Sequence, residues 1–491
     1  MVSRSTWVSA LVPLAALAVG SAVALDAASA RADGAFPDSQ GLLLPADRPN
    51  DLMLATTFGV VISTDGGQTW TYSCEMMTNG ALAAFYNMGP PPRDRLFAIT
   101  DIALIYSDDR ACTWSKAGGM LAGKPPVDYF PDAANADRVW AARPPDTSAG
   151  SYTIVESMDG GATFNTVRFT AAVGDAITGV ELAKSDAKTA YVTLRSGANF
   201  TPKLAVTKDD GATWTTRDLS MVAAIGNGNV RLVSIDPANP SKIFLRISTP
   251  SGATMGDGIA LSPDGGATFV SPPPLTLPGG VLNSFTRLTD GTLLVAGIDG
   301  VRNVIFRSTD GGMTFTELPA PVVRGLGQRN GIAYAASNDD VNDPNGFALA
   351  QSTDDGTTFQ SILHFADLRA ISSCVKTICA DDCNLKVNLG IWSENVCTAT
   401  IDAGSSSDAA TDAGAPQVKS SGCSCGAASG AGSRLDGATT IGVALFLMLL
   451  LSRGPARRRP YFSSLFGLAG WSRSARKRSP IAFSRPDSDG S

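Results

Sequence analysis

The octet Ser308-Thr-Asp-Gly-Gly-Met-Thr-Phe315 decides the fold, because the sequence contains seven copies of it. Each copy places an Asp two positions after a Ser or Thr and ends on a Thr and an aromatic residue. The seven Asp residues are Asp65, Asp109, Asp159, Asp209, Asp264, Asp310 and Asp354. The seven aromatic residues are Trp70, Trp114, Phe164, Trp214, Phe269, Phe315 and Phe359. Successive Asp residues lie 44 positions (Asp65 to Asp109) to 55 positions (Asp209 to Asp264) apart, which indicates a repeat of that length.

Each octet is predicted to form a tight turn between two strands. The Asp and Ser side chains accept backbone N–H bonds inside the turn, and glycine tolerates dihedral angles that other residues resist. The closing aromatic begins the next strand and is expected to be buried between adjacent sheets, which stabilises the fold by a few kcal/mol per ring. The second copy carries Arg110 and Ala111 where most copies have glycine. We therefore expect its turn to be distorted.

The segments around each octet alternate short apolar runs with turn residues. Before the fifth octet, the runs 230–235, 243–248 and 258–261 are predicted strands, and a turn at 236–240 separates the first two. The runs 81–86, 96–100 and 102–106 precede the second octet in the same order. Four strands per repeat of this length are typical of a propeller blade. The sequence therefore predicts an all-β fold, a seven-bladed β-propeller with four-stranded blades.

The octets resemble the Asp boxes, or BNR repeats, of sialidase-like, photosystem-assembly-factor-like and xyloglucanase-like propellers. The resemblance covers roughly residues 36–370. In those families the box is a scaffold turn remote from the binding site. The resemblance therefore implies that the seven Asp carboxylates are structural and that the ligand face lies elsewhere on the propeller.

The two ends of the chain predict export. Residues 1–32 are typical of a signal peptide, with Arg4, an apolar run from Trp7 to Leu25, and small residues that favour cleavage after Ala30 or Ala32. An uncleaved anchor helix is the alternative. Residues 401–437 are a predicted disordered tether, because their Ala, Gly, Ser, Asp and Thr cannot bury enough apolar surface.

The C-terminal region resembles the myxobacterial C-terminal sorting tag, in which Cys423 matches the invariant cysteine. A short hydrophobic segment (438–452) and a basic tail (453–491) follow. The resemblance implies a sorting protease as partner, cleavage near Cys423 and anchoring at the cell surface or outer membrane. A retained membrane anchor and release after processing are the alternatives. This chain continues further beyond its arginines than the tag usually does.

The cysteines fit an oxidising compartment. Cys74 and Cys112 flank or lie within the first two repeats, so a bridge between neighbouring blades is expected. Four more cysteines fall in the predicted cap segment, residues 371–400, and two disulfides are expected among Cys374, Cys379, Cys383 and Cys397. Zinc is the competing interpretation, but paired C-x-x-C spacing is missing and the single histidine, His364, lies outside this segment.

Charge excludes one class of partner. Residues 453–491 carry nine Lys or Arg and two Asp, a charge of +7, which leaves −13 of the net −6 for the rest of the chain. Nucleic-acid binding requires clustered positive charge, so we expect no nucleic acid as partner of the exported domain. The sequence also shows no pattern typical of a metal or cofactor site.

Five residues are candidates for a ligand face. Arg231, Arg287 and Arg324 lie in or beside predicted innermost strands, and Asp128 and Tyr129 occupy a similar position. A sialidase-like enzyme needs an arginine cluster, and a glycoside hydrolase needs a pair of carboxylic acids. Solvated loop arginines and ordinary channel polarity explain these residues equally well. We assign no catalytic residue, and a packed or solvated role is expected for His364.

These observations favour a surface-anchored propeller that binds a glycan or protein ligand without catalysis. A secreted glycoside hydrolase or sialidase-like enzyme is the first alternative, and a converging acid pair or arginine cluster in the channel would distinguish it. A periplasmic assembly factor that binds a protein partner is the second alternative.

Overall fold

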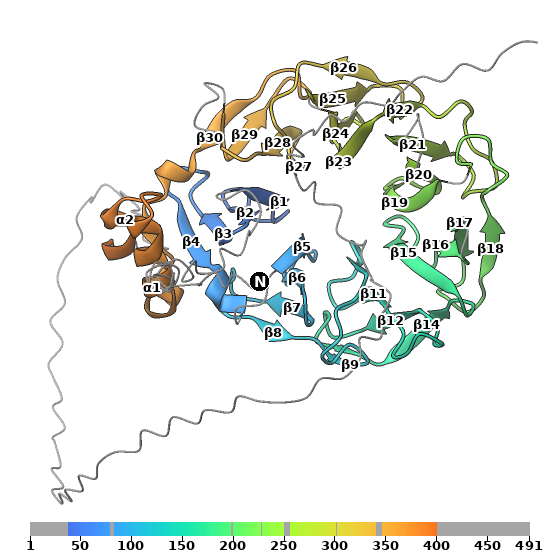
Figure 1. The fold of residues 1–491 in the computed structure, drawn as a ribbon, viewed down its shortest axis with the longest axis horizontal. Coiled ribbons are helices and arrows are strands. Elements are labelled where there is room, and N and C mark those ends of the chain that lie inside the picture. The colour runs from blue at the N-terminus through green and yellow to red at the C-terminus, as the bar shows by residue number, and fades with distance from the viewer. Residues whose placement is uncertain are drawn as a thin grey trace, which may run out of the picture. The chain divides into compact units, whose positions relative to one another are not determined.

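Seven antiparallel sheets form a ring around a common centre in the computed structural model (Figure 1). It describes residues 38–78, 83–197, 200–226, 228–249, 256–300, 302–339 and 346–399. The predicted signal peptide (1–32), tether with Cys423 (401–437), hydrophobic segment (438–452) and basic tail (453–491) lie outside the described residues. The prediction of an all-β, seven-bladed propeller with four-stranded blades is confirmed.

The strands follow one another outward from the centre within each blade. Blade 1 contains β1 (Ser39–Leu43), β2 (Leu52–Thr56), β3 (Gly59–Ser63) and β4 (Thr71–Cys74), and blade 2 contains β5 (Ala83–Met88), β6 (Leu96–Thr100), β7 (Leu104–Ser107) and β8 (Ser115–Lys116). Blade 3 contains β10 (Asp128–Pro131), β11 (Val139–Arg143), β12 (Thr153–Ser157) and β14 (Thr166–Thr170), and a parallel pair, β9 (Gly118–Gly119) with β13 (Thr163–Phe164), links it to blade 2.

The remaining blades repeat the same order. Blade 4 contains β15 (Asp175–Leu182), β16 (Ala190–Ser196), β17 (Thr201–Thr207) and β18 (Thr215–Asp218), and blade 5 contains β19 (Asn229–Asp236), β20 (Asn239–Thr249), β21 (Gly256–Ser262) and β22 (Leu275–Pro278). Blade 6 contains β23 (Gly280–Arg287), β24 (Leu293–Asp299), β25 (Arg302–Ser308) and β26 (Thr316–Leu318), and blade 7 contains β27 (Gly325–Arg329), β28 (Ile332–Ala336), β29 (Leu349–Ser352) and β30 (Gln360–Leu363).

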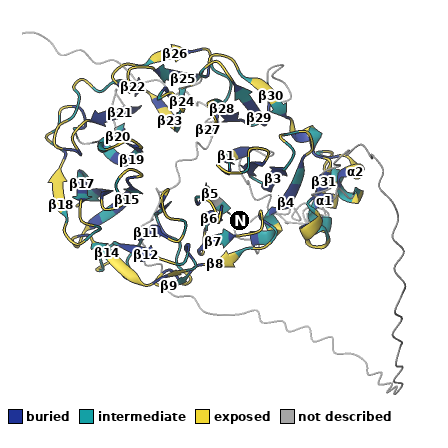
Figure 2. Ribbon diagram, turned by 180° about the vertical axis from the view of Figure 1, so that it is seen from behind, coloured by how far each residue is buried: buried dark blue, intermediate teal, exposed yellow. Residues whose placement is uncertain are grey.

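Burial follows the position of a strand in its blade. The middle strands are mostly buried, as β2 and β11 illustrate, because both of their faces pack against neighbouring blades. The outermost strand β18 is exposed at all of its positions. Figure 2 shows the same gradient, with exposed residues along the outer rim. The core therefore lies between blades, and each blade depends on its neighbours for burial.

Every octet forms the same hydrogen-bonded turn between the third and fourth strands of its blade. In the sixth octet, Ser308 Oγ donates to Asp310 Oδ1 (2.8 Å) and accepts the Gly312 N–H (2.8 Å). Asp310 Oδ1 accepts the Thr314 N–H (3.0 Å), and Asp310 Oδ2 accepts the Thr314 hydroxyl (2.6 Å). The same four bonds occur in the other six octets. The turn satisfies its own polar groups.

The second octet keeps this turn, so the expected distortion does not occur. Arg110 and Ala111 adopt the left-handed φ values of 56° and 65° that the other octets mostly give to glycine. The Ala111 N–H still reaches Ser107 Oγ (3.0 Å), and its carbonyl accepts the Ser73 hydroxyl (2.6 Å). Neighbouring contacts therefore hold a backbone conformation that costs about 1–3 kcal/mol for a residue with a side chain.

The octet aromatics pack against the preceding blade, but most are not fully enclosed. Trp70 and Phe164 are buried, with 2% and 0% of their surface exposed. The other five, Trp114, Trp214, Phe269, Phe315 and Phe359, are half-buried. Trp214, for example, contacts Trp140 and Phe169 of blade 3 with ring centroids 6.2 and 4.8 Å apart. The rings therefore pack between adjacent sheets, but five of them keep one edge in solvent because the turn lies at the rim.

The ring closes where blade 7 meets blade 1. A short strand after blade 7, β31 (Ala370–Ile371), pairs in parallel with β4 and makes blade 1 five-stranded. Arg329, at the end of β27, donates to the Asp51 carbonyl (2.5 Å) and the Pro49 carbonyl (2.6 Å) in blade 1. Blade 1 therefore contains strands from both the beginning and the end of the propeller sequence.

A small helical cap follows β31. It consists of a 3-10 turn (Ser373–Val375), α1 (Lys376–Asn388) and α2 (Glu394–Thr398). Its Trp392 packs on Tyr72 and Phe58 of blade 1, with ring centroids 4.4 and 5.3 Å apart. In the described part of the chain, neither α1 nor any other helix is long and apolar enough to cross a membrane.

The six cysteines form three disulfides, two between the cap and the ring and one within the cap, in a pairing that differs from the expected one. Cys74 pairs with Cys379, Cys112 pairs with Cys374, and Cys383 pairs with Cys397. All six cysteines form disulfides, as expected. The predicted Cys74–Cys112 bridge was wrong, and so was the prediction that the four cap cysteines pair only with one another. The reason is the cap's position, since α1 and the turn before it dock on blade 1 beside the second octet and bring Cys374 and Cys379 to the two blade cysteines. Only the 14-residue Cys383–Cys397 link is local to the cap.

Candidate functional site

The candidate ligand-face residues lie on or beside innermost strands, but they do not form one cluster. Arg287 ends β23 and donates from Nη1 to Asp236 Oδ2 of blade 5 (2.5 Å). Arg324 precedes β27 and pairs with Asp38, just before β1, with Nε 3.2 Å from Oδ2. Each arginine therefore joins two neighbouring blades through its own aspartate. The structure does not bring the three candidate arginines to a shared anion.

Tyr129 is also not on the ligand face. Its ring is buried between blades 2 and 3, and its hydroxyl donates to the Phe85 carbonyl (2.6 Å). Burial raises the pKa of this phenol well above its usual range, and the nearby Asp128 carboxyl adds to the effect. Because side chains alternate along a strand, Tyr129 faces the core when its neighbour Asp128 faces the centre. Tyr129 is therefore a packing residue.

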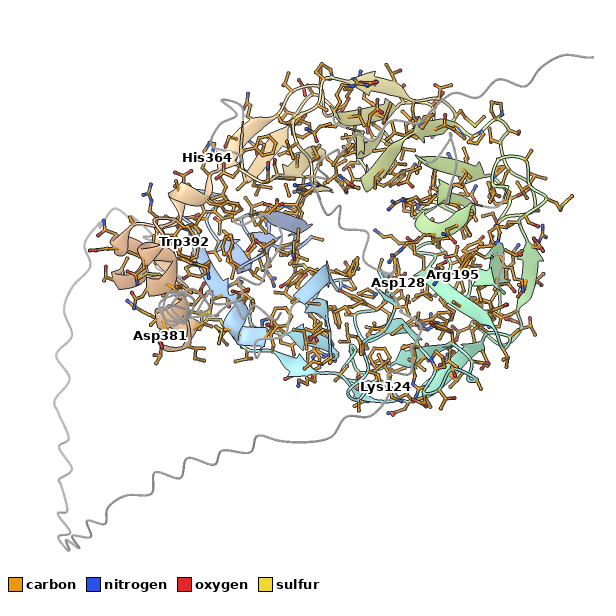
Figure 3. The ribbon with its side chains drawn as sticks, viewed as in Figure 1. Lys124, Asp128, Arg195, His364, Asp381 and Trp392 are labelled. Carbon is orange, nitrogen blue, oxygen red and sulfur yellow. A yellow bond between two sulfur atoms is a disulfide. The ribbon has the colours of Figure 1, made fainter. Side chains whose placement is uncertain are left out.

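Asp128 and Arg231 are the only two of the five candidates that meet in the described structure. In β19 the buried residues Val230 and Leu232 flank Arg231, so its side chain leaves the sheet on the opposite side. Arg231 Nη2 lies 3.1 Å from Asp128 Oδ1, although the two residues belong to blades 5 and 3. The Arg231 side chain is 43% exposed and that of Asp128 21% exposed. Figure 3 shows Asp128 at the inner rim of the ring.

Strand β15 of blade 4 lies between these two residues, and its local shape leaves space for their ion pair. It is bulged between Ile177 and Gly179, and the Val180 N–H after the bulge donates to Asp128 Oδ2 (3.0 Å). A Cβ atom at Gly179 would lie 3.3 Å from both Asp128 Oδ2 and Arg231 Cγ, closer than side chains normally pack. A bulge re-aims a strand locally, and here the glycine leaves room for the ion pair.

Glu181 on the same strand completes the group, and the sequence analysis missed it. Burial and the neighbouring Asp128 carboxyl raise the pKa of Glu181 to about 8, against the pull of the Ile235 amide and the Arg231 charge. Burial also raises the pKa of Asp128, although Arg231 and the Val180 amide oppose the shift. At neutral pH Glu181 is therefore mostly a neutral acid that can donate a hydrogen bond. We call Asp128, Glu181 and Arg231 the channel cluster.

Sequence reasoning had no signal for Glu181. It lies in the run Gly179-Val-Glu-Leu182, where a single acidic residue on a predicted strand is as consistent with a solvated face as with a site. The neighbours that perturb its pKa come from blades 3 and 5 and are separated from it by about 50 residues in the chain. Only the ring brings them together.

The octet carboxylates are occupied by their own turns. All seven have lowered pKa values; hydrogen bonds from the Thr358 amide and hydroxyl hold that of Asp354 at about 2, and those from Thr314 lower that of Asp310 further. They remain ionised at neutral pH, and each carboxylate is held by hydrogen bonds within its own turn. No group of three or more His, Cys, Asp or Glu side chains within the described ranges is arranged to hold a metal ion.

A cavity lies on the octet side of blades 1 and 2. Its volume is about 300 Å³, and Arg48, Asp94 and Arg110 contribute to its lining. Arg48 bridges Asp51 and Asp94, both at 2.9 Å, and Arg110 also pairs with Asp51 (3.0 Å). Its charged groups are thus largely paired with one another. This arrangement is that of an ion-pair network that joins two blades.

Comparison with known proteins assigns no function. No family model matches the sequence, and no curated protein shows significant similarity to it. Among solved structures, YCF48 from Cyanidioschyzon merolae is similar, at 16% identity and a TM-score of 0.42, over 62% of this chain and 93% of that one. The GH74 xyloglucanase from Xanthomonas campestris is similar at 14% identity and a TM-score of 0.36, over 67% of this chain and 59% of that one. A Hadza microbial sialidase is similar at 13% identity and a TM-score of 0.38, over 59% of this chain and 71% of that one.

Proposed function

We propose that this chain is an exported, surface-anchored β-propeller that binds a neutral glycan at its channel cluster without cleaving it. The observation that supports the site most is the 3.1 Å contact between Arg231 of blade 5 and Asp128 of blade 3 at the inner rim. Glu181 of the intervening blade 4 is near enough for both charges to act on its pKa. Ligand sites on propellers and barrels form where strands from several repeats converge.

The chemistry of the cluster favours a hydroxyl-rich ligand. Arg231 supplies N–H donors, Asp128 supplies acceptor oxygens, and the neutral Glu181 supplies both a donor and an acceptor. A sugar hydroxyl both donates and accepts, so it can satisfy this mixture. An anionic ligand would have to displace Asp128 from Arg231, 3.1 Å away, and would then face the negative charge of a half-buried aspartate.

Export and anchoring are supported by the ends of the chain and by its cysteines. Three disulfides are typical of a protein that folds outside the reducing cytoplasm. The segment 1–32 has the features of a signal peptide, and the region around Cys423 resembles a sorting tag. We include in the proposal that a sorting protease processes this tag and leaves the propeller at the cell surface.

A glycoside hydrolase is the second candidate, and one observation favours it. Asp128 and Glu181 are two neighbouring carboxyl groups, one of them with a pKa raised into the range of a general acid. Against this candidate, Asp128 is ion-paired with Arg231 at 3.1 Å and accepts the Val180 N–H, which holds it as an ionised hydrogen-bond acceptor and weakens it as a base or nucleophile. The arginine cluster that a sialidase-like site requires is not formed by the three candidate arginines.

The test measures retention and release together. The purified protein is incubated with a panel of neutral polysaccharides and sialylated glycans, and bound protein and released sugar are both quantified. We expect retention of the wild type on a neutral glycan, loss of retention in Arg231→Ala, and no released sugar. The control is Arg302→Ala, because Arg302 is an exposed, ion-paired arginine on the outer part of blade 6.

Two outcomes would contradict the proposal. Sugar release that disappears in Glu181→Gln and Asp128→Asn would establish the hydrolase instead. Retention that Arg231→Ala and Arg302→Ala reduce equally would remove the channel cluster as the binding site.

A further inference from the structure

The single histidine of the chain lies between a serine hydroxyl and a buried carboxylate. His364 Nε2 is 3.0 Å from Ser361 Oγ, and His364 Nδ1 is 2.8 Å from Asp339 Oδ1. Figure 3 places His364 at the outer edge of the ring, between blade 7 and the cap, whereas Asp128 lies at the inner rim. This group is therefore separate from the channel cluster.

Contacts other than the one with His364 hold the side chain of Asp339 in place. Its side chain is only 9% exposed, and Asp339 Oδ2 accepts the Phe365 N–H at 2.6 Å. Asp339 also has a left-handed backbone, with φ of 50°, which is uncommon for a residue with a side chain. The other carboxylate oxygen, Asp339 Oδ1, therefore points at the imidazole. A carboxylate on Nδ1 sets the histidine tautomer that leaves Nε2 able to accept a proton.

Ser361 is exposed and lies on β30, the outermost strand of blade 7. Within the described residues, β30 pairs only with β29, so one edge of this strand faces solvent. A substrate can reach the hydroxyl from the outside without entering the channel.

We propose that Ser361, His364 and Asp339 form a hydrolytic site for solvent-exposed carboxylic esters. Ser361 and His364 are the catalytic residues, and Asp339 is a positioning residue. This activity goes beyond glycan binding at the channel cluster and does not depend on it.

The reaction has two balanced steps. Ser361 Oγ attacks the ester carbonyl carbon while its proton passes to His364 Nε2, and the tetrahedral intermediate then expels the alcohol, which takes that proton. Water next attacks the acyl-serine, again giving its proton to Nε2, and the carboxylic acid leaves as Ser361 recovers its hydrogen. Ester and water are consumed, and acid and alcohol are formed.

A purely structural role explains this arrangement less completely. Asp367 Oδ2 accepts the His364 N–H (3.0 Å), and Asp339 Oδ2 accepts the Phe365 N–H, so two carboxylates already hold this turn through its backbone. The bond between the imidazole and the exposed Ser361 hydroxyl adds little to a turn that is already fixed. That bond is the contact that a nucleophile and its base require.

The first experiment uses p-nitrophenyl acetate as the ester and a fluorophosphonate as the active-site probe. The fluorophosphonate forms an Oγ–P bond and expels fluoride, so a labelled peptide identifies the reactive serine. We expect label on Ser361 alone, and a fall in hydrolysis of at least about 100-fold in Ser361→Ala and His364→Asn. Ser115→Ala is the matched control, because Ser115 is an exposed serine on the outermost strand β8.

The second measurement tests Asp339 by a signal that packing does not supply. With one histidine in the chain, a single downfield proton resonance should report the Nδ1–H bond to Asp339, and Asp339→Asn should remove it. We expect Asp339→Asn to lower kcat with little change in KM, at a melting temperature that shows the variant is folded. Equal hydrolysis by wild type, Ser361→Ala and Ser115→Ala, or labelling spread over both serines, would overturn the proposal.

Discussion

The octet turns and the inner strands of the ring differ in how much they repeat. All seven turns use the same Ser or Thr, Asp and Thr with the same four hydrogen bonds, even where Arg110 and Ala111 replace glycine. At the inner rim, by contrast, the channel cluster takes an aspartate from blade 3, a glutamate from blade 4 and an arginine from blade 5. The difference teaches that repetition in this chain marks the scaffold, and that the candidate site lies where the repeats diverge.

The cap disulfides should have the largest effect on the scaffold and none on the channel cluster. Replacing Cys74 and Cys379 by Ala opens a link with a sequence separation of 305 residues. Because Cys112–Cys374 stays closed, the loop that this link closes is only about 43 residues, and the chain-entropy model predicts a loss of about 4 kcal/mol. Replacing Cys383 and Cys397 opens a link of only 14 residues and should cost about 3 kcal/mol. Chemical denaturation measures both. Equal losses would show that ring closure does not depend on the cap.

The loss of stability on replacing an octet aromatic should depend on how deeply its ring is buried and not on which aromatic residue it is. Trp70→Ala removes a buried ring that also donates from Nε1 to the Gly67 carbonyl (3.0 Å), and should cost about 3–5 kcal/mol. Trp214→Ala removes a half-buried ring and should cost about 1–3 kcal/mol. Thermal and urea unfolding of the two variants provide the measurement. A larger loss for Trp214 would reject the partial exposure seen at the rim.

Low pH should destabilise the propeller because it protonates the octet carboxylates. The octet carboxylates have pKa values below 3.8 in the folded chain, so their contribution is present above about pH 4 and is lost as the pH falls through about 2, the pKa of Asp354. We expect Asp354→Asn to lower the melting temperature by about 1–3 °C at pH 7 and to change it less at pH 2. Asp355→Asn is the neighbouring control and should change neither value. A loss that is independent of pH would refute this assignment.

At Glu181 we expect a pH dependence of the opposite sign. Its pKa is raised from 4.5 to about 8, so the folded state is progressively penalised as the pH rises from 4.5 to about 8. Glu181→Gln should therefore melt at a higher temperature than the wild type at pH 9 and show the smallest difference near pH 5. Glu317→Gln, at an exposed carboxylate of β26, is the control. Identical pH profiles for all three proteins would contradict the burial of Glu181.

The sequence predicts the propeller because each octet contains its whole stabilising network within eight residues. The same locality explains the correct placement of Arg231, Arg287 and Asp128 on innermost strands. What could not be predicted depends on contacts between blades, such as the separate aspartate partners of Arg287 and Arg324 and the neighbours of Glu181. The disulfide pairing failed for the same reason, since Cys74 and Cys379 meet only after the ring has closed.

Quantitative binding of a retained glycan to the wild type, Arg231→Ala and Arg302→Ala tests the channel cluster most directly. Isothermal titration calorimetry should show that Arg231→Ala weakens binding at least about tenfold, the loss expected when a hydrogen bond from a charged group is removed, whereas Arg302→Ala binds as the wild type does. Unchanged affinity in Arg231→Ala would contradict the account, because the ligand would then bind away from the channel cluster.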